Sequence, residues 1–60
     1  MFEKGDKATF FGDEVIVFEA ERVQVLGDKK PVREVKIRYV DQAKGKGVQT
    51  VSGAHLVHVR

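Results

Sequence analysis

The residue types in this chain that most often do chemistry lie close together, with Ser52, His55 and His58 inside one short segment. Imidazole nitrogens bind transition metals, and a histidine beside a serine can act as a general base. The chain has no cysteine, so a metal site would need carboxylates from elsewhere as further ligands. Residues three apart on a strand face opposite sides, so the two histidines could share a metal only if a helical turn continued past Leu56. We therefore predict no metal site and expect histidines that face solvent or form hydrogen bonds.

Motifs of nucleophilic catalysis and of phosphate binding are the next candidates. Ser52 has no glycine-rich nucleophile elbow, and its spacing from His55 fixes neither a base nor an orienting group. The KGKG segment at 44–47 lacks the strand, loop and helix context of a phosphate cradle, and no GxGxxG motif occurs. These patterns favour a protein without catalytic residues or cofactor, and 44–47 is interpreted as a hairpin loop.

Charge is distributed unevenly along the chain. Residues 1–21 contain two lysines against six acidic residues, a net charge of −4, whereas residues 22–60 contain nine basic residues against three acidic ones, a net charge of +6. Such asymmetry indicates a polyanionic partner. Seven of the nine basic residues lie between positions 29 and 46: Lys29, Lys30, Arg33, Lys36, Arg38, Lys44 and Lys46.

This basic segment predicts a nucleic-acid-binding face. Lys36 and Arg38 share one side of an alternating strand, so we expect them to anchor phosphates, while the other five residues extend a sequence-tolerant footprint. The alternative is an ordinary solvated strand face that limits aggregation. If the acidic first third folds against this hairpin, its carboxylates neutralise part of the basic face.

Binding of single strands would also require exposed aromatic rings for base stacking. Phe10 and Phe11 are adjacent and face opposite sides, so we expect one of them to be partly exposed. Phe2, near the terminus, is the other candidate. Tyr39 is in phase with the apolar side of its strand and is expected in the core.

The elements that position these residues are all strands. No window shows a helical period, and six glycines divide the chain into short segments rich in Val, Phe and Thr. Gly12-Asp13 can form a two-residue hairpin turn, a second turn is expected at 27–31, and Ser52 can cap one 3₁₀ turn. The expected strands cover residues 6–11, 14–26, 32–40, 48–51 and 57–59.

The second of these strands changes phase in the middle. Val15, Ile16, Val17 and Phe18 are apolar on both faces, and regular alternation returns only further along the strand. We therefore expect a bend or bulge near 19–22. A small closed barrel needs such a strand, because each strand then serves two packing surfaces.

Length and composition predict a single domain that spans residues 1–60. A chain of this size buries only about 60% of its unfolded surface, so the core must be small. The absence of cysteine fits a reducing cytoplasm, and the first residues contain neither the apolar run nor the cleavage site of a signal peptide. We expect a cytoplasmic protein with no membrane partner.

Five strands with a bent second strand, a central hairpin and a terminal 3₁₀ turn resemble the Src-homology-3-like small barrel over nearly the whole chain. The resemblance implies the fold and leaves the function open, because that architecture serves many functions.

A shorter segment is similar to the end of the plasmid-borne type II dihydrofolate reductases, which are Src-homology-3-like barrels assembled as tetramers around a pore. The similarity implies that Gln49 contacts folate and a nicotinamide cofactor in such a pore. The chain departs from the family at Thr50 and Val51, where the family has isoleucine and tyrosine, and it lacks tryptophan. The matching positions are Val48, Gln49, Ala54, Leu56 and Val59.

These patterns predict an all-β, five-stranded, Src-homology-3-like barrel that acts as a non-catalytic binding module, with nucleic acid as the first partner. A second hypothesis is a protein-interaction or self-assembly domain, in which a barrel edge or the groove beside residues 52–56 takes a peptide or a second copy. A third is a reductase that acts as a homo-oligomer.

Overall fold

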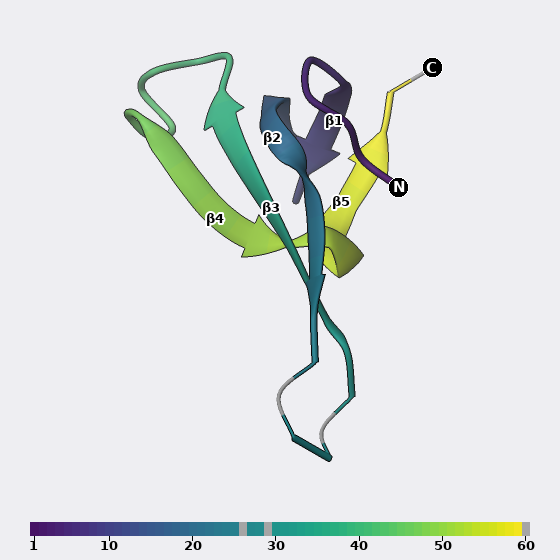
Figure 1. Ribbon diagram of the computed structural model, residues 1–60. Coiled ribbons are helices and arrows are strands. Elements are labelled where there is room, and N and C mark those ends of the chain that lie inside the picture. Colours follow the sequence, from purple (N-terminus) through teal and green to yellow (C-terminus); the bar gives the residue numbers. More distant parts are fainter. Residues whose placement is uncertain (26, 29, 60) are drawn as a thin grey trace.

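Five antiparallel strands and one 3₁₀ turn make up the fold in the computed structural model, which describes every residue except Leu26, Lys29 and Arg60 (Figure 1). The all-β prediction and the terminal 3₁₀ turn are confirmed. Across the described residues, no helix is long and apolar enough to cross a membrane. The elements in chain order are β1 (Lys7–Phe10), β2 (Asp13–Gln24), β3 (Val32–Tyr39), β4 (Val48–Ser52), the 3₁₀ turn η1 (Gly53–His55) and β5 (Leu56–His58).

The strands form one sheet with the order β4-β3-β2-β1-β5. β4 and β5 are its two edges, and no backbone pairing joins them within the described part of the chain. The sheet is therefore open here, and closure into a barrel stays a prediction. The hairpin that connects β2 to β3 extends away from the other strands (Figure 1).

β2 bends where the sequence predicts a bulge. Its pairing with β3 shifts register twice, between Val17 and Glu19 and again between Glu19 and Arg22. The first residues of β2 also pair with β1, so that one strand serves both neighbours. The bend or bulge predicted near 19–22 is confirmed by these register shifts.

The hairpin turn between β1 and β2 lies one residue earlier than predicted. Phe10 pairs with Asp13, so the central residues are Phe11 and Gly12 rather than Gly12 and Asp13. Both have positive φ, 49° and 86°, as the tight turns that match strand twist require. Gly12 adopts this conformation without strain, whereas a phenylalanine at Phe11 costs on the order of 1–2 kcal/mol.

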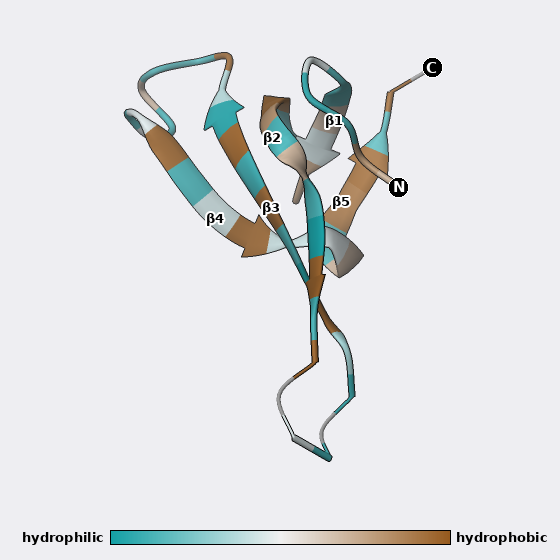
Figure 2. Cartoon of the chain, in the orientation of Figure 1, coloured by the Kyte–Doolittle hydropathy of each residue, from teal (hydrophilic) through white to brown (hydrophobic). Residues whose placement is uncertain are grey.

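The core lies on one side of the sheet and is small. Along β3, buried Val35 and Ile37 alternate with exposed Lys36 and Arg38, and the ribbon of β3 shows the alternation as brown and teal bands (Figure 2). Tyr39 packs against the core, as predicted. The buried apolar residues are Phe2, Ala8, Val15, Val17, Val35, Ile37 and Leu56.

Phe2 belongs to this core, and its prediction as an exposed aromatic was wrong. Its side chain is 3% exposed and stacks on the His58 ring, with 3.8 Å between the ring centroids. Backbone hydrogen bonds hold the first residues along β2, because the Glu21 N–H donates to the Phe2 carbonyl at 2.9 Å and the Gly5 N–H donates to the Val17 carbonyl at 2.8 Å. Sequence position near a terminus therefore did not indicate exposure.

Replacement of this ring tests its place in the core. We expect Phe2→Ala to lower the free energy of unfolding by about 3–5 kcal/mol, because it removes a buried ring and leaves a cavity. Phe18→Ala, on a ring that is 45% exposed, should cost less than about 1.5 kcal/mol. Urea denaturation followed by circular dichroism measures both, and equal losses would contradict the burial of Phe2.

Candidate functional site

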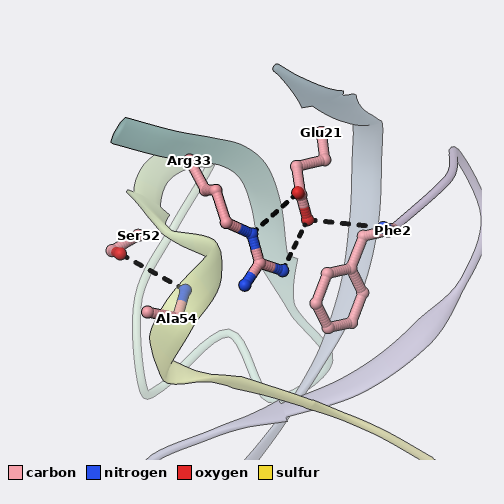
Figure 3. Close-up of polar contacts among 5 residues, drawn as sticks. All are labelled: Phe2, Glu21, Arg33, Ser52 and Ala54. Carbon is pink, nitrogen blue, oxygen red and sulfur yellow. Dashed lines mark hydrogen bonds and ion pairs between the residues drawn. The ribbon is translucent and has the colours of Figure 1, made fainter. Parts of the chain in front are cut away.

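A buried carboxylate lies between the strands that carry most of the candidate residues. The Glu21 side chain is 2% exposed and accepts hydrogen bonds from Arg33, at 2.8 Å from Nε and 3.0 Å from the terminal nitrogen (Figure 3). The Phe2 backbone N–H donates to the same carboxylate at 3.4 Å. These donors hold the Glu21 pKa below its usual value, mainly through the Arg33 hydrogen bonds and against the opposing effect of burial. Arg33 is thus committed to a structural contact.

The inner side of the two strands is where the residues meet. Glu21 is the next buried residue of β2 after Val15 and Val17, beyond the two register shifts, and Arg33 is in phase with Val35 on β3. Both side chains therefore face the inner side of the sheet. The interpretation of Arg33 as one more phosphate contact missed this, although its phase separates it from Lys36 and Arg38.

The 3₁₀ turn closes over this pair. A Cβ at Gly53 would lie 3.2 Å from Glu21 Oε1 and 3.3 Å from Arg33 side-chain atoms. Ser52 caps the turn as predicted, since its hydroxyl accepts a hydrogen bond from the Ala54 N–H at 3.3 Å (Figure 3). The turn that ends the sheet therefore packs against the ion pair.

Carboxylates of the acidic first third reach two further cations of the basic set. Lys36 Nζ lies 3.7 Å from Glu19, and Lys44 Nζ lies 3.7 Å from Asp13. Together with Arg33, three of the seven predicted phosphate contacts thus have a carboxylate partner. Among the described residues Lys30, Arg38 and Lys46 form no ion pair. Lys29 lies outside the described residues.

The predicted basic set is also spread along the molecule. Lys36 and Arg38 share the outer face of β3, as expected. Lys30 belongs to the projecting β2–β3 hairpin, whereas Lys44 and Lys46 belong to the loop at the other end of β3 (Figure 1). The structure does not bring these groups together over one face.

Charges of both signs alternate on the outer face of the sheet. The described residues that line two depressions there include four cations and three carboxylates, a local net charge of only +1. A surface that neutralises several phosphates would instead gather one sign of charge. The charged lining residues are Lys7, Arg22, Lys36 and Arg38 against Glu14, Glu19 and Glu34.

The larger depression is an open groove of about 850 Å³ across β1, β2 and β3. Strand register places Ile16 between Arg38 and Lys7, so the two cations flank an apolar residue. Val40 and Val59 also line the groove and are 54% and 49% exposed. The groove therefore combines an apolar surface with two cations at its sides.

The carboxylate in this groove is Glu14, which lies beside its apolar surface. The Val40 N–H donates to the Glu14 carbonyl at 3.1 Å, and Glu14 is paired with Thr9 on β1. Glu14 is the second residue after the β1–β2 turn, so this turn is close in sequence to a residue that lines the groove.

The two histidines contact different phenylalanines. His58 stacks on Phe2 and lies 3.6 Å from Asp6, while the His55 ring centroid lies 5.2 Å from that of Phe11. η1 ends at His55 and β5 begins at the next residue. In the described part of the chain, no group of three or more His, Asp or Glu side chains is arranged to hold a metal ion.

Phe11 is an exposed ring at the tip of the β1–β2 turn. It is 74% exposed, whereas Phe10 is half-buried and packs against the core, so the prediction that one of the two is exposed is confirmed. The Phe11 ring meets Phe10 edge to face, with 4.6 Å between centroids. The Phe11 backbone has a φ of 49°, and strained backbone conformations of this kind cluster at functional positions.

Gln49 lies inside the fold of its own chain. It is half-buried on β4 opposite Ile37, and a Cβ at Gly45 would collide with its amide and lie 2.9 Å from the Tyr39 ring. The β3–β4 loop thus packs against Gln49. Contact of this residue with folate and a nicotinamide cofactor stays a prediction.

No family model, curated protein or solved structure matches the chain. The Src-homology-3-like and reductase resemblances accordingly stay predictions.

The buried ion pair predicts a stability loss in acid. Because the Glu21 pKa is lowered in the folded state, its contribution is fully present above its unfolded value, 4.5, and is lost as the pH falls through the folded pKa. We expect the melting temperature to fall below pH 4.5, and Glu21→Gln to reduce this dependence. Thermal melts between pH 7 and pH 2 measure it, and an unchanged slope in the variant would contradict the assignment.

Removal of the two partners should have unequal effects. Arg33→Leu leaves a buried carboxylate without its cation, whereas Glu21→Leu leaves an arginine whose side chain is 43% exposed and can reach water. We expect Arg33→Leu to lower the melting temperature by roughly 15 °C. Glu21→Leu should lower it by less than half of that, and the reverse order in calorimetry would show that Glu21 is not buried as described.

Proposed function

We propose that this chain is a non-catalytic protein-interaction module that binds its partner in the outer groove of β1, β2 and β3. One observation carries the proposal: a single open groove of about 850 Å³ is lined by apolar residues and by two cations. The apolar residues are Ile16, Val40 and Val59, and the cations are Lys7 and Arg38. Ligand pockets are concave, mostly apolar and contain a few polar groups that orient the ligand, and a groove that takes one inserted side chain has the same requirements. This groove has those properties.

The chemistry of the groove selects the kind of partner. An apolar surface takes a bulky apolar side chain, and the cations on either side of Ile16 favour carboxylates next to that side chain. Among the described residues that line the groove, Glu14 alone carries negative charge, so their net charge is +1. The proposed occupant is a protein segment with one large apolar side chain flanked by acidic residues.

A short peptide tests the groove directly. We expect acetyl-Glu-Asp-Phe-Asp-Glu-amide at millimolar concentration to shift the amide resonances of Ile16, Arg38, Val40 and Val59. Replacing its phenylalanine by alanine should weaken binding about 30-fold, because most of the apolar contact is lost. Replacing the four acidic residues of the peptide by lysine should weaken its binding more than the alanine replacement does, because Lys7 and Arg38 repel the lysines.

Charge reversal supplies the matched controls on the protein. Arg38→Glu should abolish the peptide shifts, whereas Arg22→Glu, on the same face outside the groove, should leave them unchanged. Both residues are exposed, so both variants should keep the fold. Equal effects of the two variants, or equal shifts with the lysine peptide, would contradict the proposed site.

Nucleic acid is the second candidate, because Lys30, Arg38 and Lys46 form no ion pair among the described residues. Three phosphate contacts give a slope of about −2.7 for log K against log salt on duplex DNA, and seven would give about −6.3. Anisotropy of a labelled 20-base-pair duplex measures the slope.

The expected result for this candidate is weak binding with a slope near −3, which changes to about −2 in Arg38→Glu because one phosphate contact is lost. Lys36→Glu combined with Arg38→Glu should remove most of it without loss of fold. No detectable binding at low salt would eliminate polyanion recognition.

A further inference from the structure

We infer that the partner of the groove is a second copy of this chain, whose β1–β2 turn inserts Phe11 between Arg38 and Lys7. This inference rests on the proposed function, because it names the occupant of the same groove. It follows from three observations: the backbone of Phe11 is strained, the residues of the turn match the chemistry of the groove, and the turn lies close to the groove in the same chain.

The strain lies at Phe11 itself. Its φ is 49°, in the left-handed region that favours Gly or Asn, and its ring is 74% exposed. The ring touches Phe10 and His55 within the chain, yet most of its surface remains in contact with water. An intrachain packing role would bury this ring, whereas a contact with another molecule requires it to be exposed.

The chemical match is that of the segment the groove selects. The turn presents one large apolar ring, and the two residues after Gly12 are Asp13 and Glu14. The groove presents Ile16 between the cations Arg38 and Lys7. A phenylalanine followed by two carboxylates is therefore complementary in charge to an apolar surface flanked by two cations, although Asp13 also lies 3.7 Å from Lys44 and Glu14 lines the groove of its own chain.

The position of the turn permits a closed pair. Glu14 lines the groove and lies three residues after Phe11, so each copy carries the inserting turn and the receiving groove side by side. Two such surfaces related by a two-fold axis can each insert and receive at once. The product is a dimer, in which two phenylalanine rings leave water together.

Sedimentation equilibrium over a range of concentrations tests the inference. The wild type should pass from one chain mass, 6.7 kDa, towards twice that value as the concentration rises. Phe11→Asn should weaken association at least 100-fold, because both rings are lost from the symmetric contact. Phe18→Asn, on a ring that is 45% exposed outside the groove and the turn, is the matched control and should leave association unchanged.

Thermal melts at concentrations where all variants are monomeric separate loss of contact from loss of fold. Phe11→Asn should raise the melting temperature by about 5 °C, because asparagine tolerates the left-handed conformation. A fall in melting temperature would show that Phe11 is a packing residue and would overturn the inference.

The peptide titration keeps the two proposals apart. If acetyl-Glu-Asp-Phe-Asp-Glu-amide binds the groove but the wild type stays monomeric, the groove is a docking site and the second copy is the wrong occupant. A dimer that persists in Phe11→Asn also overturns the inference and points to the sheet edges. If the peptide shifts no amide resonances and the chain stays monomeric, the proposed function itself is overturned.

Discussion

The arrangement of this small sheet depends on one buried carboxylate that must be neutralised. Glu21 lies on the inner side of a strand whose register shifts twice, and a charge without a partner would be costly there. Arg33 supplies two hydrogen bonds from β3, and the Phe2 backbone supplies a third from the first residues of the chain. The carboxylate thus joins the chain start, β2 and β3, and η1 packs over it at Gly53.

This constraint changes the meaning of the charge asymmetry. The acidic first third folds against the basic segment, and Glu19, Glu21 and Asp13 each meet a cation of that segment. Three of the six acidic residues in 1–21 therefore pair with this segment within the described part of the chain. The outer face carries charges of both signs around exposed apolar residues.

Local patterns predicted the elements well, since alternation around Val35 and Ile37 and the capping position of Ser52 depend only on neighbours in sequence. The contact between Glu21 and Arg33 was not predictable in this way, because its partners are twelve residues apart and meet only after two register shifts. The burial of Phe2 depends on the same long-range pairing. The groove likewise combines residues of several strands. Its position depends on the register in which β2 pairs with β1 and β3, which local sequence patterns do not specify.

The central claim, that Phe11 of one copy occupies the groove of another, predicts contacts between chains. An isotope-filtered NOE experiment on a mixture of carbon-13-labelled and unlabelled protein measures them at concentrations where association is detected. We predict NOEs from the Phe11 ring of one chain to the methyl groups of Ile16, Val40 and Val59 of the other. If the sample is dimeric and the Phe11 ring shows NOEs only to Phe10 and His55 of its own chain, the claim is contradicted.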